Sequence, residues 1–363
     1  MTFPALTVRE AVESDRGRWN NFVEAAATPG LNRFEWRAIL HDVYGPACRF
    51  FLAEDTGDTL RGIAAGYINP AHGSSATYYG LRFGLVAGDA WAEGALIERV
   101  RSACHEQGVA PGFICSGYQP LATPDSNTSD ERRTALLDID GSAEHVWKRL
   151  RDKTRNIIRK GTRAGLVAEW GGHNLSAFYE LYASTFTEKG RAVHSWRFFE
   201  RLFAELPGNS ALLAAKVDGI MVGATVVLFS GSVLHYPFQV ASNTANRSLA
   251  PNSFMVWELV QEAVRRGISR IDMGESQAGS GAYRFKLHFG GRPAPIHYYR
   301  LTLGRHGESR RGGSRALRPV VLSAIPAQSR RRLAALRAVS VGALPLKVRR
   351  RLAVARAGRG RIL

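Results

Sequence analysis

Cysteine is scarce in this chain, and its scarcity excludes two kinds of scaffold. Three cysteines occur, Cys48, Cys104 and Cys115, at irregular spacing. That number and spacing suit neither a disulfide framework nor a zinc-binding cluster. We expect reduced, buried thiols of the kind found in cytoplasmic proteins, and we predict no metal site.

Long apolar runs and several common catalytic motifs are also missing. No window of eighteen uninterrupted apolar residues exists, so no transmembrane helix is predicted. Residues 1–17 lack a basic segment followed by an apolar one, so no signal peptide is expected. The chain contains no GxxxxGK[ST], HExxH, CxxC or GxSxG sequence, which removes the P-loop, zinc-protease, thiol-redox and α/β-hydrolase interpretations. We therefore expect a cytoplasmic protein.

Acidic residues are nearly absent from the C-terminal tail. From Arg305 to Leu363 the chain has sixteen Arg and Lys residues and one acid, Glu308. This tail carries +15 of the net charge of +18, and residues 1–304 carry +3. Short apolar faces beside dense arginines predict that residues 306–363 bind an anionic membrane surface, at the inner face of the cell membrane. A disordered soluble tail and RNA binding are the alternatives.

The remaining residues predict an α/β protein in which one pattern is used twice. The segment CRFFLAEDTGDTLRGIAAGY (48–67) resembles SALLAAKVDGIMVGATVVLF (210–229). Each has an apolar run, a turn with Asp and Gly, and a second apolar run, which is a hairpin signal. Helical spacing before and after each hairpin completes two similar units. We predict domains at 1–141 and 142–305, a tail at 306–363, and a basic helix over 142–164 that joins the domains.

One stretch, residues 271–291, concentrates the chemistry. An apolar strand ends in an acid, Asp272, where ligands commonly bind in α/β sheets. A loop with Glu275, Gly279 and Gly281 follows. The next segment carries Tyr283 and Lys286 three positions apart, so on a helix they share one face.

A predicted helix start lies just upstream. Pro251, Asn252 and Ser253 begin an apolar-periodic segment, and Arg247 precedes them. Free N–H groups and the helix dipole make such a start a phosphate site. An ordinary capped helix is the alternative.

These motifs resemble the FemAB-like branch of the GNAT acyltransferase superfamily, including the FemAB-like proteins of exopolysaccharide and exosortase loci. The resemblance rests on residues 250–252 (APN), 271–276 (IDMGES), 279–286 (GSGAYRFK) and the basic segment 150–166. It covers roughly residues 5–305 and implies two tandem GNAT-like domains. Relatives usually carry Arg where this chain has Glu275. The first domain lacks a Gly-x-Gly-x-Tyr-x-Phe-Lys segment, so we expect the donor site in the second domain and the acceptor side in the first.

The resemblance also implies roles for the candidate residues. Tyr283 would protonate the leaving thiolate, while Asp272 would act as a base or cap its loop. Lys286 would bind donor phosphate or an acceptor anion, with a solvated lysine as the alternative. Arg155 and Lys160 sit at positions that match the family pattern, where they would either contact phosphate or have a structural role. Glu275 and His235 are reserve bases, although a satisfied structural histidine is the favoured interpretation of His235.

The predicted function is transfer of an acyl group from an acyl-thioester, acyl-CoA, to an amine on a cell-envelope or polysaccharide precursor, with no further cofactor. One alternative is a FemAB-type aminoacyltransferase that uses aminoacyl-tRNA. A tRNA user should offer many phosphates a broad basic surface, and residues 1–304 carry little net charge. Another alternative is a degenerate, non-catalytic GNAT pair that binds polysaccharide or a synthesis complex.

Overall fold

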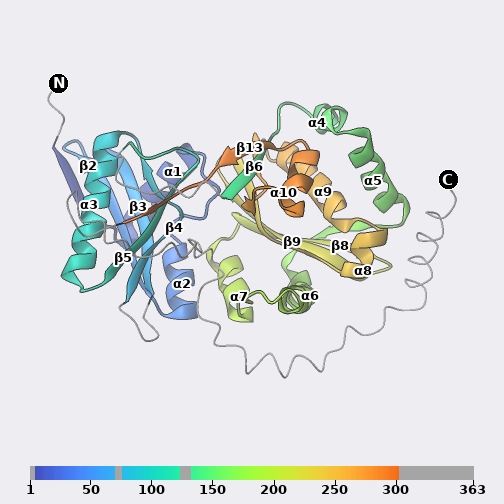
Figure 1. The fold of residues 1–363 in the computed structure, drawn as a ribbon, viewed down its shortest axis with the longest axis horizontal. Helices are drawn as coiled ribbons and strands as arrows, with labels where there is room; N and C mark the ends of the chain where they lie inside the picture. Colours follow the sequence, from blue (N-terminus) through green and yellow to red (C-terminus); the bar gives the residue numbers. More distant parts are fainter. Residues whose placement is uncertain (1–4, 70–75, 123–131, 302–363) are drawn as a thin grey trace.

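Two separate sheets divide the molecule into a first and a second half. The computed structural model describes residues 5–69, 76–122 and 132–301, and Figure 1 shows the halves side by side. The sheet of the first half has the order β1-β2-β3-β4-β5-β14. Its strands are β1 (Leu6–Glu10), β2 (Ala47–Asp55), β3 (Leu60–Asn69), β4 (Thr77–Ala87), β5 (Ala110–Gly117) and β14 (His297–Arg300). Its helices are η1 (Glu13–Asp15), α1 (Arg16–Ala25), α2 (Trp36–Tyr44) and α3 (Ala90–Glu106).

The sheet of the second half has the order β12-β6-β11-β10-β9-β8-β7, and β13 also pairs with β6. Its strands are β6 (Arg132–Asp138), β7 (Val167–Trp170), β8 (Ser210–Val217), β9 (Ile220–Ser230), β10 (Val233–Ala241), β11 (Arg270–Asp272), β12 (Ser276–Gln277) and β13 (Arg292–Pro295). Its helices are α4 (Ala143–Arg149), α5 (Asp152–Arg163), η2 (Gly172–Asn174), α6 (Leu175–Glu188), α7 (Trp196–Glu205), α8 (Asn243–Ser248), α9 (Pro251–Arg265) and α10 (Gly281–His288). Two tandem GNAT-like α/β domains, as predicted, account for this arrangement.

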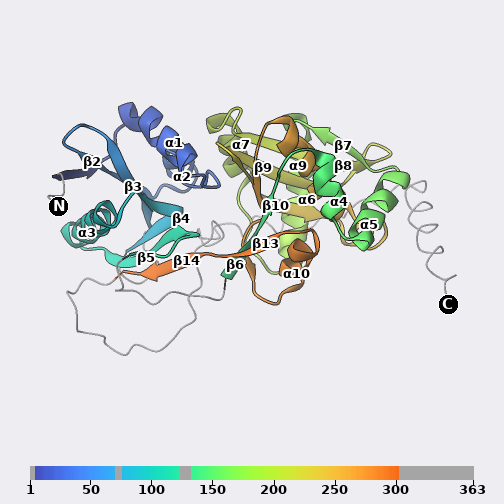
Figure 2. The same ribbon diagram turned by 90° about the horizontal axis from the view of Figure 1, so that it is seen from above.

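Two strands cross the predicted division at residue 141. β6 precedes that division in sequence but pairs with β11 and β13 inside the second sheet. β14 follows it but pairs with β5 in the first sheet. Figure 2 shows the chain running directly from β13 in the second half into β14, which lies along β5 in the first half. Each sheet therefore contains one strand from the other side of the predicted division.

The predicted joining helix is wrong in two respects. Residues 142–164 form two helices, because Leu150 and Arg151 between them are extended, with ψ of 141° and 145°. Both helices pack on α9 of the second half rather than between the sheets. Gly161 lets α5 approach the turn between α8 and α9, since an added Cβ would lie 2.9 Å from the carbonyl oxygen of Leu249 in that turn.

A shared apolar core holds the halves together. One cluster of buried side chains includes Trp36 of α2 and Phe198 of α7, whose rings lie 6.2 Å apart. An ion pair of 2.6 Å between Asp42 and Arg201 borders the same contact between α2 and α7. Burial of large aromatic side chains from both halves favours one cooperative unit.

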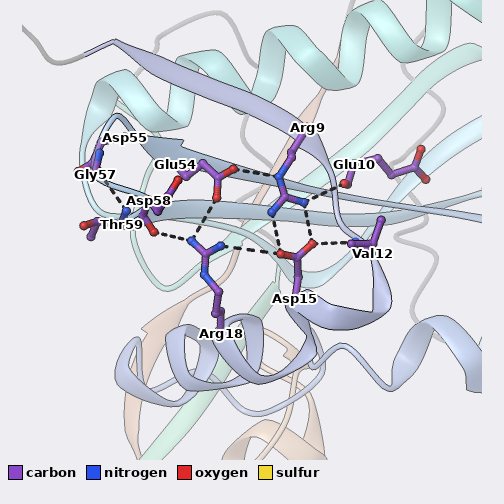
Figure 3. Close-up of polar contacts among 10 residues, drawn as sticks. All are labelled: Arg9, Glu10, Val12, Asp15, Arg18, Glu54, Asp55, Gly57, Asp58 and Thr59. Carbon is purple, nitrogen blue, oxygen red and sulfur yellow. Dashed lines mark hydrogen bonds and ion pairs between the residues drawn. The ribbon is translucent and has the colours of Figure 1, made fainter.

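Polar side chains stabilise the outer end of the first half (Figure 3). Arg9 of β1 donates to both carboxylate oxygens of Asp15 at 2.7 Å and to Glu54 at 2.9 Å. Arg18 of α1 donates to Glu54 at 3.1 Å and to the carbonyl of Asp58 at 2.5 Å. These bidentate and shared contacts join β1, α1 and the β2–β3 hairpin. We interpret them as structural, because every charge in the network is matched.

The three cysteines are unpaired and buried, as expected. No helix in the described part of the chain is long and apolar enough to cross a membrane. The tail from residue 306, with its predicted membrane role, lies outside the described residues.

Candidate active site

The glycine loop, residues 273–280, connects β11 to α10. Gly274 and Gly279 have φ of 81° and 74°, a left-handed conformation that favours glycine. Ser280 ends the loop and caps α10, because its hydroxyl accepts from the Tyr283 amide at 3.1 Å. Gly281 is open to solvent, and an added Cβ there would meet nothing within 4 Å. Gly279 is therefore required by backbone conformation, whereas Gly281 is not required by sterics.

Asp272 holds the first turn of the glycine loop. The residue is 0% exposed. Its Oδ1 accepts from the Gly274 amide at 2.8 Å and from the Thr134 hydroxyl, and its Oδ2 accepts from the Tyr118 hydroxyl at 2.7 Å. Burial opposes ionisation, but neighbouring charges and these hydrogen bonds hold the pKa of Asp272 below its usual range. A buried carboxylate with this many donors is a positioning group rather than a base that meets substrate.

Lys286 holds the other side of the loop. Its Nζ donates to the carbonyl of Gly274 at 2.6 Å and to the hydroxyl of Ser276 at 2.8 Å. Burial lowers the pKa of Lys286 to about 8. Asp272 and Lys286 thus meet at Gly274, which agrees with the predicted common location.

Glu275, predicted as a reserve base, forms ion pairs with two arginines. Its side chain is 4% exposed. Oε1 accepts from Arg132 at 2.7 Å, and Oε2 accepts from the Tyr298 hydroxyl at 2.5 Å. Arg82 lies 3.8 Å from Oε2. The charge that differs from relatives is therefore balanced within this chain, and Glu275 is not available as a free base in this structure.

His235 presents one free ring nitrogen. Its Nδ1 lies 3.0 Å from the carbonyl oxygen of Asp272. A carbonyl can only accept, so Nδ1 carries the proton and Nε2 has a free lone pair. Nε2 is buried without a hydrogen-bond partner among the described residues. Burial lowers the pKa of His235 to about 4, so the ring is neutral at physiological pH.

Beyond His235, the β11 side of β10 has no neighbouring strand in the described part of the chain. β10 pairs with β11 only from Val233 to His235, and its register with β9 shifts between His235 and Phe238. Such bulges often lie beside active sites. Further along this edge, Tyr236 Oη and Gln239 Oε1 are buried and lack partners among the described residues. Buried polar atoms are normally satisfied, so this edge is suited to a ligand.

The start of α9 adjoins the same edge. Gln239 donates to Asn252 Oδ1 at 2.9 Å. Ala250 precedes the helix in a left-handed conformation, with φ of 54°, and no side-chain hydrogen bond caps the helix within the described segments. Ser253 is buried in the first turn. Asn252 and Ser253 thus occupy the predicted helix start; Arg247 lies on α8, and its side chain is outside the described atoms.

Arg155 and Lys160, the two residues predicted to contact phosphate, both lie on α5. Arg155 donates to the carbonyls of Trp147 and Lys148, at 3.4 and 3.1 Å, and pairs with Asp152. These contacts join α4 to α5. Lys160 lies half-buried toward the end of α5. Phosphate binding by either residue stays a prediction.

Several residues of this site carry no sequence motif. Arg82 on β4, Tyr118 after β5 and Tyr298 on β14 belong to the first half, while Arg132 and Thr134 lie on β6. Each contacts Asp272 or Glu275. Strands β6 and β14 bring Arg132, Thr134 and Tyr298 there, whereas Arg82 and Tyr118 reach the site from the first half. Sequence reasoning missed them because topology alone places them together. Tyr283, buried on α10, was predicted correctly to lie on the Lys286 side of this helix.

The described residues contain no cluster of three His, Cys, Asp or Glu residues that could hold a metal ion. A hollow of about 440 Å³ opens in the first half, between α2 and the start of β2. Its lining includes no predicted site residue. Its acids are already paired, Glu13 with Arg16 at 2.6 Å and Asp42 with Arg201 at 2.6 Å. The glycine loop stays the predicted location of the chemistry.

Comparisons with known proteins match part of the chain to a family model and most of the chain to solved structures. The sequence profile of the Acetyltransferase (GNAT) domain matches residues 148–287. No curated protein sequence matches the chain. The solved structure of FemX is 15% identical and superposes with a TM-score of 0.64 over 81% of this chain and 97% of its own.

Two further structures share the fold. A tandem GNAT protein from the clavulanic acid biosynthesis pathway is 12% identical, with a TM-score of 0.52 over 84% of this chain and 100% of its own. The C-terminal domain of a putative lysylphosphatidylglycerol synthetase from Agrobacterium fabrum is 12% identical, with a TM-score of 0.52 over 78% and 91%. Residues 148–287 therefore match the acetyltransferase (GNAT) domain model, and the chain shares the fold of FemX and of the tandem GNAT protein.

Proposed function

We propose that this protein transfers an acyl group from an acyl-CoA thioester to an amine. The observation that carries the proposal is the unpaired edge of β10. Its pairing with β11 ends at His235, and the buried polar atoms Tyr236 Oη and Gln239 Oε1 lie beyond that point without partners among the described residues. A donor laid along this edge would satisfy those atoms, and its phosphates would reach the start of α9 at Asn252 and Ser253.

The reaction needs a proton acceptor and a proton donor. The amine nitrogen attacks the thioester carbonyl, so a C–N bond forms and the C–S bond breaks. The free Nε2 of His235 accepts the proton that the amine loses. Tyr283 returns a proton to the leaving thiolate. Asp272 acts through its carbonyl, which fixes the tautomer of His235.

Lys286 and Glu275 serve this reaction by shaping the glycine loop. Lys286 donates to Gly274 and Ser276, and Glu275 neutralises Arg132. The non-catalytic alternative rested on the charge change at Glu275. Because cations of this chain balance that charge, the change is compatible with an active enzyme.

The acceptor that we propose is an amine on a cell-envelope or polysaccharide precursor, met in the cytoplasm. The support is similarity of fold to FemX and to a protein named as a lysylphosphatidylglycerol synthetase domain. A lipid-linked acceptor would require the protein to work near a membrane, which is the role predicted for the tail.

A second candidate donor is aminoacyl-tRNA. One observation favours it: Arg151 just before α5, and Lys153 and Arg159 on its exposed side, have no acidic partner among the described residues. Such a row of cations suits phosphodiesters. The acyl-CoA donor is preferred because the unsatisfied buried atoms lie at β10, not at α5.

The test is calorimetric titration of the full chain with CoA. The variant N252D places a carboxylate at the helix start, where it suits the dipole and keeps the helix but repels phosphate. We expect N252D to weaken CoA binding roughly tenfold, about 1.4 kcal/mol. The control S195D adds the same charge at the start of α7, where Ser195 caps the helix, and should bind as the native protein does. Binding of tRNA but not CoA would reverse the order of the two donors.

A further inference from the structure

Arg82 is set on a distorted part of β4 in the first half. Residues 81–84 of β4 lie opposite Ala65 alone, because the register with β3 shifts there. Phe83 has φ of 58°, a left-handed conformation that a bulky side chain rarely adopts. An added Cβ at Gly84 would lie 2.4 Å from the Ala65 carbonyl oxygen, so this bulge requires glycine. Bulges redirect side chains, and strained backbone is often functional.

The bulge directs Arg82 at the second half. Its side chain is 13% exposed and lies over the Phe83 ring at 5.5 Å. Its Nη2 lies 3.9 Å from Asp272 Oδ2, and its Nε lies 3.8 Å from Glu275 Oε2. These are ion-pair distances longer than hydrogen bonds. Nε and Nη2 are buried and lack hydrogen-bond partners among the described residues.

The two carboxylates that face Arg82 flank the first turn of the glycine loop. Asp272 accepts from the Gly274 amide, and Lys286 donates to the Gly274 carbonyl. Arg82 is the cation that Asp272 and Glu275 share. Removing it would leave the buried Asp272 without this cation, and an uncompensated buried charge favours rearrangement.

We propose that Arg82 is a positioning residue for the glycine loop, acting across the two halves through Asp272 and Glu275. The loop conformation then depends on the placement of the first half against the second. The first half therefore contributes to the donor side of the site as well as to the acceptor side. This inference does not depend on which donor is used.

The experiment measures amide hydrogen exchange of residues 273–281 in the full chain without any ligand. We expect R82Q to speed exchange of the Gly274 amide by at least about tenfold, as loss of local protection would. R82K keeps the charge and should recover a large part of the protection. The matched control is R201Q, which breaks the Arg201–Asp42 ion pair between α7 and α2. That pair also joins the halves, but it lies away from the loop.

Equal loosening of the glycine loop in R201Q and R82Q would overturn the proposal, since any loss of contact between the halves would then suffice. Unchanged exchange in R82Q, or no recovery in R82K, would also overturn it. If R82Q does not fold, E275Q replaces it, because glutamine retains an acceptor for Arg132 or Tyr298 and removes the charge that faces Arg82. Unchanged loop exchange in E275Q would contradict the proposal. The exchange measurement needs no donor, so its result stands even if CoA does not bind.

Discussion

Asp272 shows what can and cannot be predicted for a single residue. Its place at a strand end before a glycine loop follows from the sequence, and so does its proximity to Lys286. Its role does not, because the groups that decide it, Tyr118 and Thr134, lie 154 and 138 positions away in the chain. A carboxylate that receives these donors is a positioning group. The same limit applies to Glu275, whose partners Arg82 and Tyr298 carry no motif.

His235 allows a prediction about pH. Burial lowers the pKa of His235 to about 4 and that of His194 to about 3. The unfolded chain binds a proton at each below about pH 6.5, and the folded chain does not. Their contribution to stability is therefore complete above pH 6.5 and is lost as the pH falls toward 4. Each histidine should add about 1.4 kcal/mol per pH unit to the slope in this window.

The measurement is urea unfolding of the native protein and of H235Q at pH values between 6.5 and 4. We expect H235Q to reduce the slope by about 1.4 kcal/mol per pH unit. The control H41Q replaces an exposed histidine with glutamine as well and measures the effect of the substitution itself. Equal slopes in H235Q and the native protein would show that His235 is not held neutral.

At the scale of elements, local pattern predicted most of the structure. The hairpin around Asp218 and Gly219 forms as expected, because both residues are left-handed, with φ of 49° and 77°. The helix predicted to start at residues 251–253 forms as α9, and the strand predicted to end at Asp272 forms as β11. The break between α4 and α5 was missed because a continuous apolar stripe hides two extended residues. The exchange of β6 and β14 was missed because register and partner are set by tertiary packing, not by local pattern.

The placement of β14 in the first sheet and of β6 in the second predicts which strands each core mutation destabilises. Tyr299 of β14 is buried in the core of the first half, and Leu137 of β6 is buried in that of the second. Y299A and L137A should each lower the free energy of unfolding by about 2–5 kcal/mol, the usual range for such cavities. Hydrogen exchange should accelerate first in β5 for Y299A and in β11 for L137A. If each variant instead loosens the half to which it belongs in sequence order, the strand exchange is wrong.

At the scale of the whole molecule, charge is divided unevenly. Residues 1–304 carry +3 of the total of +18, and the tail carries the rest. The paired charges of the described part agree with this division, since the networks around Arg9 and Glu275 join acids to bases. The function of the tail remains a prediction from composition.

That prediction can be measured directly. Full-length protein should sediment with anionic vesicles at low salt and be released at high salt, because each basic residue contributes about 1 kcal/mol near such a surface. A protein lacking residues 310–363 should stay in the supernatant, and neither form should sediment with neutral vesicles. Sedimentation of the truncated form, or none of the full-length form, would exclude a membrane role for the tail.

The proposed function depends on where the acyl donor binds. A crystal structure of the full chain with CoA tests that location most directly. We expect the pyrophosphate at residues 250–253, the pantetheine arm along β10 from Tyr236 to Gln239, and the thiol toward His235 and Tyr283. CoA bound in the first-half hollow beside Arg16 and Arg37, or a β10 edge that stays empty at saturating CoA, would contradict the account.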